Sequence, residues 1–374
     1  MAKKKNNTNK EAYYLASQWQ LMFRKLKKHR LARISFIILA FLYIVALFGN
    51  FLAPYGTEDF DSVYKDCAPT KIHTVYAGEK VGPYVCKIVK HSDKKTLRIT
   101  IEEDPSEYYK LQFFVHGVPY KVLGFIPCDL HLFGLSEGSN GGTGAKIFIW
   151  GGDSLGRDVF SRIILGSQVS LTIPFVAAAI SLFLGVLLGG ISGYFGGAID
   201  FIIQRLIEVI SSIPTIPLWL ALSAAIPPGT SSVKMYFYMT IILSFINWTG
   251  MARTVRGKFL SLKNEDYVLS AKLSGVSTWK IIRTHLVPGF MSYLIVSVTR
   301  SIPSSIVGET SMSYLGLGIK PPATSWGIML QETSSVTNIV THPHKMIPII
   351  FVTVTVLAFN FFGDGLRDAA DPYK

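Results

Sequence analysis

Residues 151–158 read GGDSLGRD and place glycines and charged side chains at a spacing that could cradle a phosphate group. A phosphate-binding loop of the form G-x4-G-K-[ST] needs a lysine that reaches the phosphates and a hydroxyl that holds Mg²⁺. Arg157 and Asp158 occupy those two positions here. The loop therefore lacks both groups, and we reject a nucleotide site. The apolar runs described below also place this segment outside a membrane, away from cytoplasmic nucleotides.

No other sequence pattern indicates catalysis or metal binding. The chain has no G-x-S-x-G, H-E-x-x-H or paired-cysteine motif. His342 and His344 would need further ligands to hold a metal ion. Cys67, Cys86 and Cys128 show no Cys/His metal spacing, and they form either one disulfide, if their segment is extracytoplasmic, or isolated thiols. We therefore expect no catalytic residue, no metal site and no cofactor bound by this chain.

The most informative polar segment is 252–289, which follows a helix–glycine–helix pattern. Residues 265–275 read as a short helix ended by Gly275, because glycine adopts the left-handed conformation that often terminates a helix. Residues 276–286 read as a second helical stretch that Pro288 closes. The sequence thus predicts a protruding hairpin.

The charge of this hairpin indicates where it lies. Residues 253–285 carry seven Lys/Arg against only Glu265 and Asp266, which predicts a cytoplasmic position. The small side chains of Ser270 and Ala271 would allow the hairpin to dock in a groove on another protein. An ordinary basic loop is the alternative interpretation.

Six apolar runs are expected to cross a membrane, and the helices they form must position this hairpin. The first, 31–53, has 23 residues and would span about 34 Å as a helix, enough for a hydrocarbon core of about 30 Å. It is too long for a signal peptide, so we expect an uncleaved anchor. The other runs are 169–194, 200–226, 235–251, 290–315 and 346–362.

Two segments outside the main apolar runs have a character of their own. Residues 1–30 are basic and are expected in the cytoplasm, with 18–30 as a short interfacial helix. In 54–168, alternating runs at 96–103 and 109–115 read as strands. Turns are expected at Gly117, Pro119, Gly124, Pro127 and 137–144. We predict a small β-rich extracytoplasmic insertion between the first two spans, followed by a five-helix core over 169–374.

Small residues and prolines inside the runs predict how the helices pack. Gly185, Gly189 and Gly193 recur at four-residue spacing, a ridge that lets two helices approach closely, so we assign them to packing. Pro214 and Pro217 break the third run, and broken helices in membranes often line a pathway.

Charged residues inside the runs are costly and tend to mark function. Arg205 and Glu208, shortly after Asp200, share one helix face and are expected as a structural ion pair. Arg300 and Glu309 lie nine residues apart, which at 100° per residue places them on opposite faces. Glu309 lies deeper in the span than Arg300 and is the better pathway candidate. The alternative is that the charged side chain belongs to a pair within the helix bundle. The pathway candidates are therefore Glu309, Arg300, Pro214 and Pro217.

The composition of the whole chain agrees with repeated lipid-facing helices. Of its 374 residues 49% are hydrophobic and 16% are charged, against roughly 25% charged in soluble domains, and the mean hydropathy is +0.36. The net charge of +13 is uneven, since 54–168 hold 13 Lys/Arg and 14 Asp/Glu while the remainder holds 24 and 10. This positive-inside pattern predicts a multi-pass protein in contact with membrane lipid, with both termini in the cytoplasm. No nucleic-acid-binding motif accompanies the charge, so no nucleic-acid partner is expected.

The hairpin resembles the coupling segment of bacterial ABC importer permeases, which reads E-A-A-x3-G-x9-I-x-L-P. The spacing from Ala271 to Gly275 and on to Pro288 is intact. Leu269 and Ser270 stand where the pattern has glutamate and alanine, His285 replaces the isoleucine and Val287 the leucine. These changes suit the dipeptide and oligopeptide branch, whose loops read D-Y-V-x-x-A-x-x-x-G-V-S with a later H-x-x-P. The residues that match this pattern are 266–268, Ala271, 275–277, His285 and Pro288.

Three further stretches resemble the same branch, in the same order along the chain. They are 151–162, with Gly152 where the branch has threonine; 313–318, followed by Pro321, Pro322 and 325–327; and 363–368, followed by Asp371 and Pro372. Together the four matches cover most of 150–374, and their order makes them specific. The insertion is larger than in the commonest members and says little about cargo.

The resemblance implies an all-α polytopic membrane fold with six transmembrane helices of the MetI-like permease type, and the β-rich insertion lies between the first two. It also implies a homologous second permease, two ABC ATPase subunits that hold ATP and Mg²⁺, and an extracytoplasmic substrate-binding protein. The ATPase-coupling residues would be Glu265, Asp266, Tyr267, Ala271, Lys272, Gly275, Val276 and Pro288. Among them, Tyr267, Ala271 and Gly275 would form the docking surface.

The function implied is that of a non-catalytic permease subunit of an importer for di- and oligopeptides in the cell (inner) membrane. The same machinery with oligosaccharide or nickel-complex cargo is one alternative. A proton-driven secondary transporter and a membrane anchor with an outer binding domain are two others. The hairpin favours the ATP-driven importer, because neither of the last two needs it.

Overall fold

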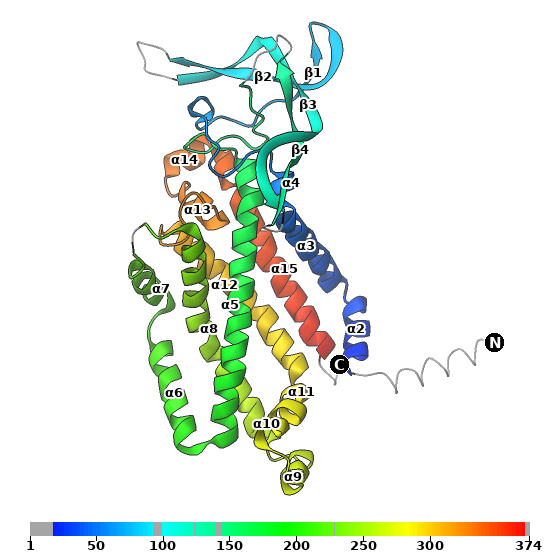
Figure 1. Cartoon of the computed structure of the whole chain (residues 1–374), viewed down its shortest axis with the longest axis vertical. Coiled ribbons are helices and arrows are strands. Elements are labelled where there is room, and N and C mark those ends of the chain that lie inside the picture. The colour runs from blue at the N-terminus through cyan, green and yellow to red at the C-terminus, as the bar shows by residue number, and fades with distance from the viewer. Residues whose placement is uncertain (1–17, 93–98, 123–124, 139–143, 228, 371–374) are drawn as a thin grey trace, which may run out of the picture.

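The computed structural model describes residues 18–92, 99–122, 125–138, 144–227 and 229–370. Its helices form one elongated bundle, with a β-sheet at one end and helices α9 to α11 at the other (Figure 1). Some predicted features lie outside the described residues: the start of the basic segment at 1–17, the strand start at 96–98, Gly124, 139–143, and Asp371 with Pro372.

The helices differ widely in length. The long ones are α3 (Arg30–Leu47), α5 (Val159–Phe195), α8 (Ser232–Leu262), α12 (Met291–Tyr314) and α15 (Ile347–Ala370). The shorter ones are α2 (Gln18–Lys28), α4 (Gly49–Leu52), α6 (Gly197–Ser212), α7 (Thr215–Ala224), α9 (Asp266–Leu273), α10 (Thr278–Ile281), α11 (Val287–Gly289), α13 (Trp326–Gln331) and α14 (Val336–Thr341). Single helical turns of other types are η1 (Ser62–Tyr64), η2 (Ile282–Leu286) and η3 (Pro343–Met346).

Several of the predicted spans correspond to helices that could cross a membrane. Among the described residues, three helical stretches are long and apolar enough: Arg30–Leu47, Val159–Phe195 and Pro343–Ala370. The number rises to five if two bent pairs, α6 with α7 and α10–α11 with α12, each count as one span. α8 has 31 residues and is long enough at about 46 Å, but tyrosine, threonine and asparagine side chains interrupt its apolar run. The structure therefore supports a multi-span helical protein without fixing the predicted number of six.

The predicted β-rich insertion is present as a four-stranded antiparallel sheet. Its strands are β1 (His73–Tyr76), β2 (Glu79–Ser92), β3 (Ile99–Val122) and β4 (Ile126–Gly138), in the order β1-β2-β3-β4. The two strands predicted at 96–103 and 109–115 form one long strand, β3, with Pro105 in a stretch where the register with β2 shifts.

The turns predicted at Gly117, Pro119 and Pro127 are wrong, because all three residues lie inside strands. The pairing of β3 with β4 changes register between His116 and Tyr120. Glycine and proline mark such bulges as well as turns, since a bulged residue needs no ladder hydrogen bond. The strand therefore bends at this point and does not reverse.

The helix that contains the second predicted span begins at Val159, so residues 159–168 are helical and do not belong to the β-rich insertion. Asp158 accounts for this earlier start, because its side chain accepts hydrogen bonds from the backbone N–H groups of Phe160 and Ser161. A side-chain acceptor before the first turn defines a helix N-terminus better than the start of an apolar run.

α5 and α8 pack against each other over a long contact, and the glycines of α5 make it close (Figure 1). A Cβ atom at Gly189 would lie 2.4 Å from the carbonyl oxygen of Ala252. A Cβ atom at Gly193 would lie 2.7 Å from Cβ of Phe259. The packing role predicted for the glycine ridge at 185, 189 and 193 is confirmed, since any side chain there would separate the two backbones.

The third predicted span is broken, as expected. α6 and α7 are bent by 88° relative to each other. Pro214 is the N-cap residue of α7, and Pro217 lies in its first turn, where a missing N–H costs no helical hydrogen bond. The two prolines therefore terminate one helix and start the next.

Candidate functional site

The predicted hairpin lies at the end of the bundle opposite the sheet (Figure 1). α9 ends before Gly275, whose φ angle is +73°. The N–H of Gly275 donates to the Lys272 carbonyl at 3.0 Å, and that of Val276 donates to the Ala271 carbonyl at 3.1 Å. These are the two hydrogen bonds of a Schellman cap, so the predicted left-handed turn is confirmed. A Cβ atom at Gly275 would meet no neighbour; glycine serves the backbone conformation here and does not relieve crowding.

One side of α9 is buried against the rest of the chain. Val268 and Ala271 pack into an apolar cluster that also contains Phe259 of α8, Leu286 and Phe290. Only 9% of Ala271 is exposed, so this residue does not lie on an open docking surface as predicted. Its contribution is to seat the hairpin on the helices around it.

The other side of the hairpin exposes large apolar side chains, of which the sequence analysis predicted Tyr267 and missed Leu269, Leu273 and Trp279. Leu273 is 90% exposed and Trp279 is 66% exposed, while Leu269 and Tyr267 are also open to the surroundings. Leu269 and Leu273 are four residues apart and share one face of α9. Leu269 and Leu273 therefore form an apolar pair on a different face of α9 from the buried Val268. A second apolar face of this kind is the sequence signal that could have identified the two exposed leucines. We refer to Tyr267, Leu269, Leu273 and Trp279 as the hairpin face.

The hairpin is also tied to the end of α5. Lys272 Nζ lies 5.2 Å from the ring centre of Tyr194, a cation–π contact. Just before α9, Lys263 Nζ donates to the Gly193 carbonyl at 3.2 Å. Any displacement of the hairpin would therefore act on α5 as well as on α8.

The remaining coupling candidates occupy the ends of the hairpin helices. Glu265 is the N-cap residue of α9, and its side chain makes no capping hydrogen bond. Asp266 is exposed in the first turn, and the partly buried Val276 packs against the apolar cluster.

Pro288 does not close the second helical stretch, contrary to prediction. A π-helical turn at Ile282–Leu286 precedes it, and the chain stays helical to Gly289. The Val287 N–H donates to the Ile282 carbonyl, five residues back. This wider turn comes directly before Pro288, whose backbone has no N–H to donate to the helix. The chain then bends by 69° into α12.

A second polar cluster lies at the opposite end, where the GGDSLGRD loop meets α5. Asp153 is buried and accepts hydrogen bonds from the N–H groups of Leu155 at 2.8 Å and Arg157 at 2.9 Å. It also accepts from Nε of Arg157 at 2.7 Å and from Nη1 of Arg162. Burial alone would raise the pKa of Asp153, but Arg162 and Arg157 outweigh burial and hold this pKa below its ordinary value.

Glu332, which follows α13, completes this cluster. Its Oε1 accepts from Arg162 Nη1 at 2.8 Å, and its Oε2 accepts from the N–H and hydroxyl of Ser154 at 3.1 Å and 2.8 Å. Two arginines therefore face two carboxylates, and the buried charges balance. This outer ion cluster of Asp153, Arg157, Arg162 and Glu332 joins the loop before α5 to the segment after α13. Local sequence carries no signal for the long-range partner Glu332.

Two further residues of the loop, Gly152 and Asp158, serve packing and capping. A Cβ atom at Gly152 would lie 2.1 Å from the Tyr64 carbonyl oxygen. The threonine that the dipeptide and oligopeptide branch has at this position would therefore not fit here. Burial raises the pKa of Asp158 to about 7, although hydrogen bonds from Ser161 lower it. These contacts make Asp158 the cap of α5.

The charged residues predicted inside the spans have distinct surroundings. Glu309 is fully buried in α12 and accepts hydrogen bonds from the hydroxyls of Ser313 at 2.8 Å and Ser170 at 3.4 Å. Arg300 is exposed on the same helix. The two residues therefore lie on opposite faces, as predicted.

The predicted ion pair between Arg205 and Glu208 is present at 2.6 Å on an exposed surface. Asp200, in the first turn of α6, instead accepts two hydrogen bonds at 2.6 Å from Arg256 of α8. The charges of the third run thus have structural partners, one pair at the surface and one between helices.

The three cysteines form no disulfide, and His344 of the histidine pair contacts the GGDSLGRD loop. All three cysteines are free thiols, so of the two predicted alternatives the structure shows isolated thiols. His344 Nε2 donates to the Gly152 carbonyl at 3.0 Å, and its ring lies beside that of His342.

Comparison with known proteins identifies the class to which this fold and hairpin belong. Residues 185–373 match the family model "Binding-protein-dependent transport system inner membrane component", and residues 17–69 match "N-terminal TM domain of oligopeptide transport permease C". The chain therefore belongs to the family of inner-membrane components of binding-protein-dependent transport systems. The predicted resemblance is confirmed, and the hairpin lies within the matched core.

Two relatives illustrate the extent of the match. The dipeptide transport system permease protein DppC of Lactococcus lactis is 32% identical over 372 residues, which are 99% of this chain and 95% of that protein. DppC of Bacillus subtilis is 41% identical over 224 residues, which are 60% of this chain and 68% of that protein. An inward-facing structure of the MetNI methionine ABC transporter aligns with a TM-score of 0.45 and 16% identity, over 56% of this chain and 97% of that one.

Neutralising the outer ion cluster should destabilise the protein. Asp153→Asn keeps an acceptor for the loop but leaves Arg157 and Arg162 short of one negative charge in a buried site, an imbalance that costs about 3–5 kcal/mol. Thermal unfolding of the detergent-purified protein should show a clearly lower midpoint. The control is Glu208→Gln, which breaks an exposed pair worth at most about 1 kcal/mol.

The sign of the pH dependence provides a further check on Asp153→Asn. Because the pKa of Asp153 is lowered in the folded protein, the natural protein is more stable than Asp153→Asn, and this difference in stability is fully present above the ordinary aspartate pKa. It shrinks as the pH falls through the lowered value. Equal midpoints for Asp153→Asn and Glu208→Gln near neutral pH would show that the cluster does not stabilise the fold.

Proposed function

We propose that this chain is one of two permease subunits of an ATP-driven importer for di- and oligopeptides in the cytoplasmic membrane. Similarity to a dipeptide permease along almost the whole chain supports the peptide cargo. The observation that carries the mechanism is the hairpin, which exposes apolar side chains on one face and is seated on α8 by the other.

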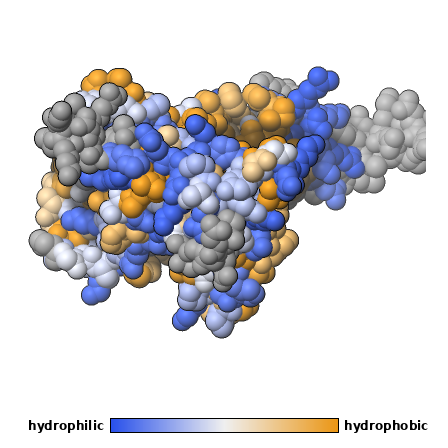
Figure 2. All heavy atoms as spheres, turned by 90° about the horizontal axis from the view of Figure 1, so that it is seen from above, coloured by the Kyte–Doolittle hydropathy of each residue, from blue (hydrophilic) through white to orange (hydrophobic). Residues whose placement is uncertain are grey.

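The proposed orientation places the hairpin and both termini in the cytoplasm and the sheet on the extracytoplasmic side. The basic charge of 253–285 supports a cytoplasmic hairpin. Seen from the sheet end, hydrophilic residues gather over the middle of the surface, with hydrophobic patches around them, which suits a face in contact with water (Figure 2). Along the bundle, exposed apolar side chains such as Phe36, Ile37 and Phe201 suit contact with lipid. In this arrangement α8 and the two bent pairs would complete six spans.

The proposed assembly contains a homologous second permease, two ABC ATPase subunits and an extracytoplasmic binding protein that delivers the peptide. The ATPase subunits would hold ATP and Mg²⁺ and perform the hydrolysis, while this chain would be non-catalytic. The hairpin face would enter a groove on one ATPase subunit. Leu273 and Trp279 are large enough to anchor such a contact, because apolar and aromatic side chains in pockets dominate interface energies.

Movement of the hairpin can reach the membrane helices through contacts that the structure contains. Val268 and Ala271 share a cluster with Phe259 of α8 and Leu294 of α12. Lys272 contacts Tyr194 at the end of α5. Because packed helices move as rigid bodies, closure of the ATPase subunits would tilt these helices and open the pathway to alternating sides.

Placing a charge on the hairpin face should uncouple transport from ATP hydrolysis. Leu273→Asp puts a carboxylate where we propose an apolar anchor, so uptake of a labelled dipeptide by intact cells should fall at least about tenfold, the equivalent of about 1.4 kcal/mol of lost docking. Val336→Asp, at a 75% exposed position of α14 near the sheet end, is the matched control and should transport normally. Normal uptake with Leu273→Asp at equal protein level would remove the coupling assignment.

Glu309 remains the best candidate for the pathway, and the adjacent Gly308 packs against Trp219 of α7, the helix that follows the break at Pro214. A buried carboxylate held by serine hydroxyls can exchange these partners for a peptide amine when the helices move. Glu309→Gln keeps the shape and is expected to lower dipeptide uptake severalfold, measured in cells at equal protein level. Glu208→Gln, an exposed acid of the same bundle, is the control; unaltered uptake with Glu309→Gln would exclude the pathway role.

A further inference from the structure

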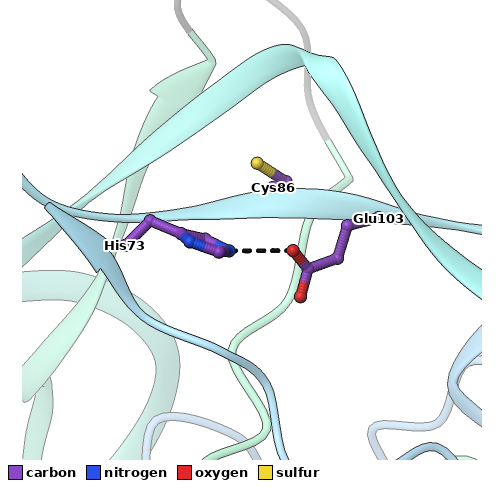
Figure 3. A group of neighbouring side chains, drawn as sticks. All are labelled: His73, Cys86 and Glu103. Carbon is purple, nitrogen blue, oxygen red and sulfur yellow. Dashed lines mark hydrogen bonds and ion pairs between the residues drawn. The ribbon is translucent and has the colours of Figure 1, made fainter. Parts of the chain in front are cut away.

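The β-sheet brings together three side chains that suit a metal ion. His73 lies in β1, Cys86 in β2 and Glu103 in β3. One ligand atom from each residue, a ring nitrogen, the thiol sulfur and a carboxylate oxygen, lies within 4.8 Å of the other two. Figure 3 shows the imidazole and the carboxylate pointing toward each other, with the Cys86 thiol close by.

The strand register explains why these three side chains share one face of the sheet. His73 pairs with Tyr84, and paired residues point to the same side of a sheet. Tyr84 lies two residues before Cys86, so His73 and Cys86 point to that same side. Glu103 pairs with Ile88, which lies two residues after Cys86, and therefore points to that side too.

A bulge in β3 is what brings Glu103 close to the other two. The partner of Cys86 is Tyr108, but the partner of the next residue, Lys87, is Asp104. In an unbroken register Ile88 would face Ser106, and the bulge places Glu103 there instead. Bulges often re-aim a side chain in this way, and here the result is a carboxylate beside a thiol and an imidazole.

The donor set has a clear chemical preference. Imidazole nitrogen, thiolate sulfur and carboxylate oxygen are the ligands of zinc in proteins, whereas Mg²⁺ and Ca²⁺ prefer oxygen alone. Cys86 is buried at the base of the group, while the side chains of His73 and Glu103 are 36% and 33% exposed. An ion could therefore enter from the open side and keep one position for water.

We propose that His73, Cys86 and Glu103 form a binding site for a divalent transition-metal ion of the zinc type, with water as the fourth ligand. The ion would replace the hydrogen bond of 2.8 Å between His73 Nε2 and Glu103 Oε2. The Cys86 thiol would release its proton to solvent and bind as the thiolate. The three bonds would fasten the short edge strand β1 to β2 and β3, and this site is independent of the proposed transport function.

The test is zinc binding by the full-length chain, purified in detergent and freed of metal with a chelator. Equilibrium dialysis against zinc alone should give one ion per chain. Co²⁺ in place of zinc should produce a thiolate-to-metal absorption band that Cys86→Ser abolishes. Cys86→Ser and Glu103→Gln should each lower zinc affinity at least about tenfold, since even partners outside the ligand set matter on that scale.

The same sheet supplies matched control variants. His116 pairs with Asp129 at 2.9 Å, and Cys128 is adjacent to Asp129. Cys128→Ser in β4 and His116→Ala, farther along β3, remove the same residue types and should leave zinc affinity unchanged. Should Cys86→Ser fail to fold, Glu103→Gln carries the test, because it keeps a hydrogen-bond acceptor for His73. Absence of zinc binding, binding that survives both site variants, or binding lost in Cys128→Ser would overturn the proposal.

Discussion

The close packing of α5 on α8 is the constraint on which the rest of the bundle depends. The glycines at 185, 189 and 193 leave no space for side chains, so the two helix backbones touch. This contact also places Phe259 against Gly193 at the end of the ridge, where Phe259 belongs to the apolar cluster beneath the hairpin. The position of the hairpin therefore depends on the contact between these long helices, to which Val268 and Ala271 of the hairpin attach.

The opposite end of α5 is held by charge. The outer ion cluster joins the loop before α5 to Glu332, and Asp158 caps the first turn of the helix. A helix of 37 residues is thus fixed by buried ion pairs at one end and by the glycine ridge and the contact with Lys272 at the other. A rigid element of this kind can carry a small displacement at the hairpin over the length of the bundle, which is what rigid-body coupling requires.

Local backbone preferences decide some features of this structure, and distant partners decide others. The cap at Gly275 and the break at Pro214 follow from backbone preferences, and both are present. Gly117 obeys the same preferences but lies in a bulged strand, because pairing with β4 outweighs its tendency to form a turn. Glu332 and Cys86 gain their surroundings from residues far away in the chain or on other strands, so no spacing pattern indicates the outer ion cluster or the three-residue ligand group.

Cross-linking from the hairpin face in the assembled complex would test most directly whether this hairpin receives the ATPase subunit. Leu273→Cys, in a chain whose native cysteines are replaced by serine, would be treated with a short thiol-reactive cross-linker in membranes. Val336→Cys, at the other end of the molecule, would be treated in parallel. Docking of an ATPase subunit on the hairpin face predicts an adduct between the Leu273→Cys chain and an ATP-binding subunit, identified by mass spectrometry, and none from Val336→Cys. A complex that hydrolyses ATP yet yields no such adduct from Leu273→Cys would contradict it.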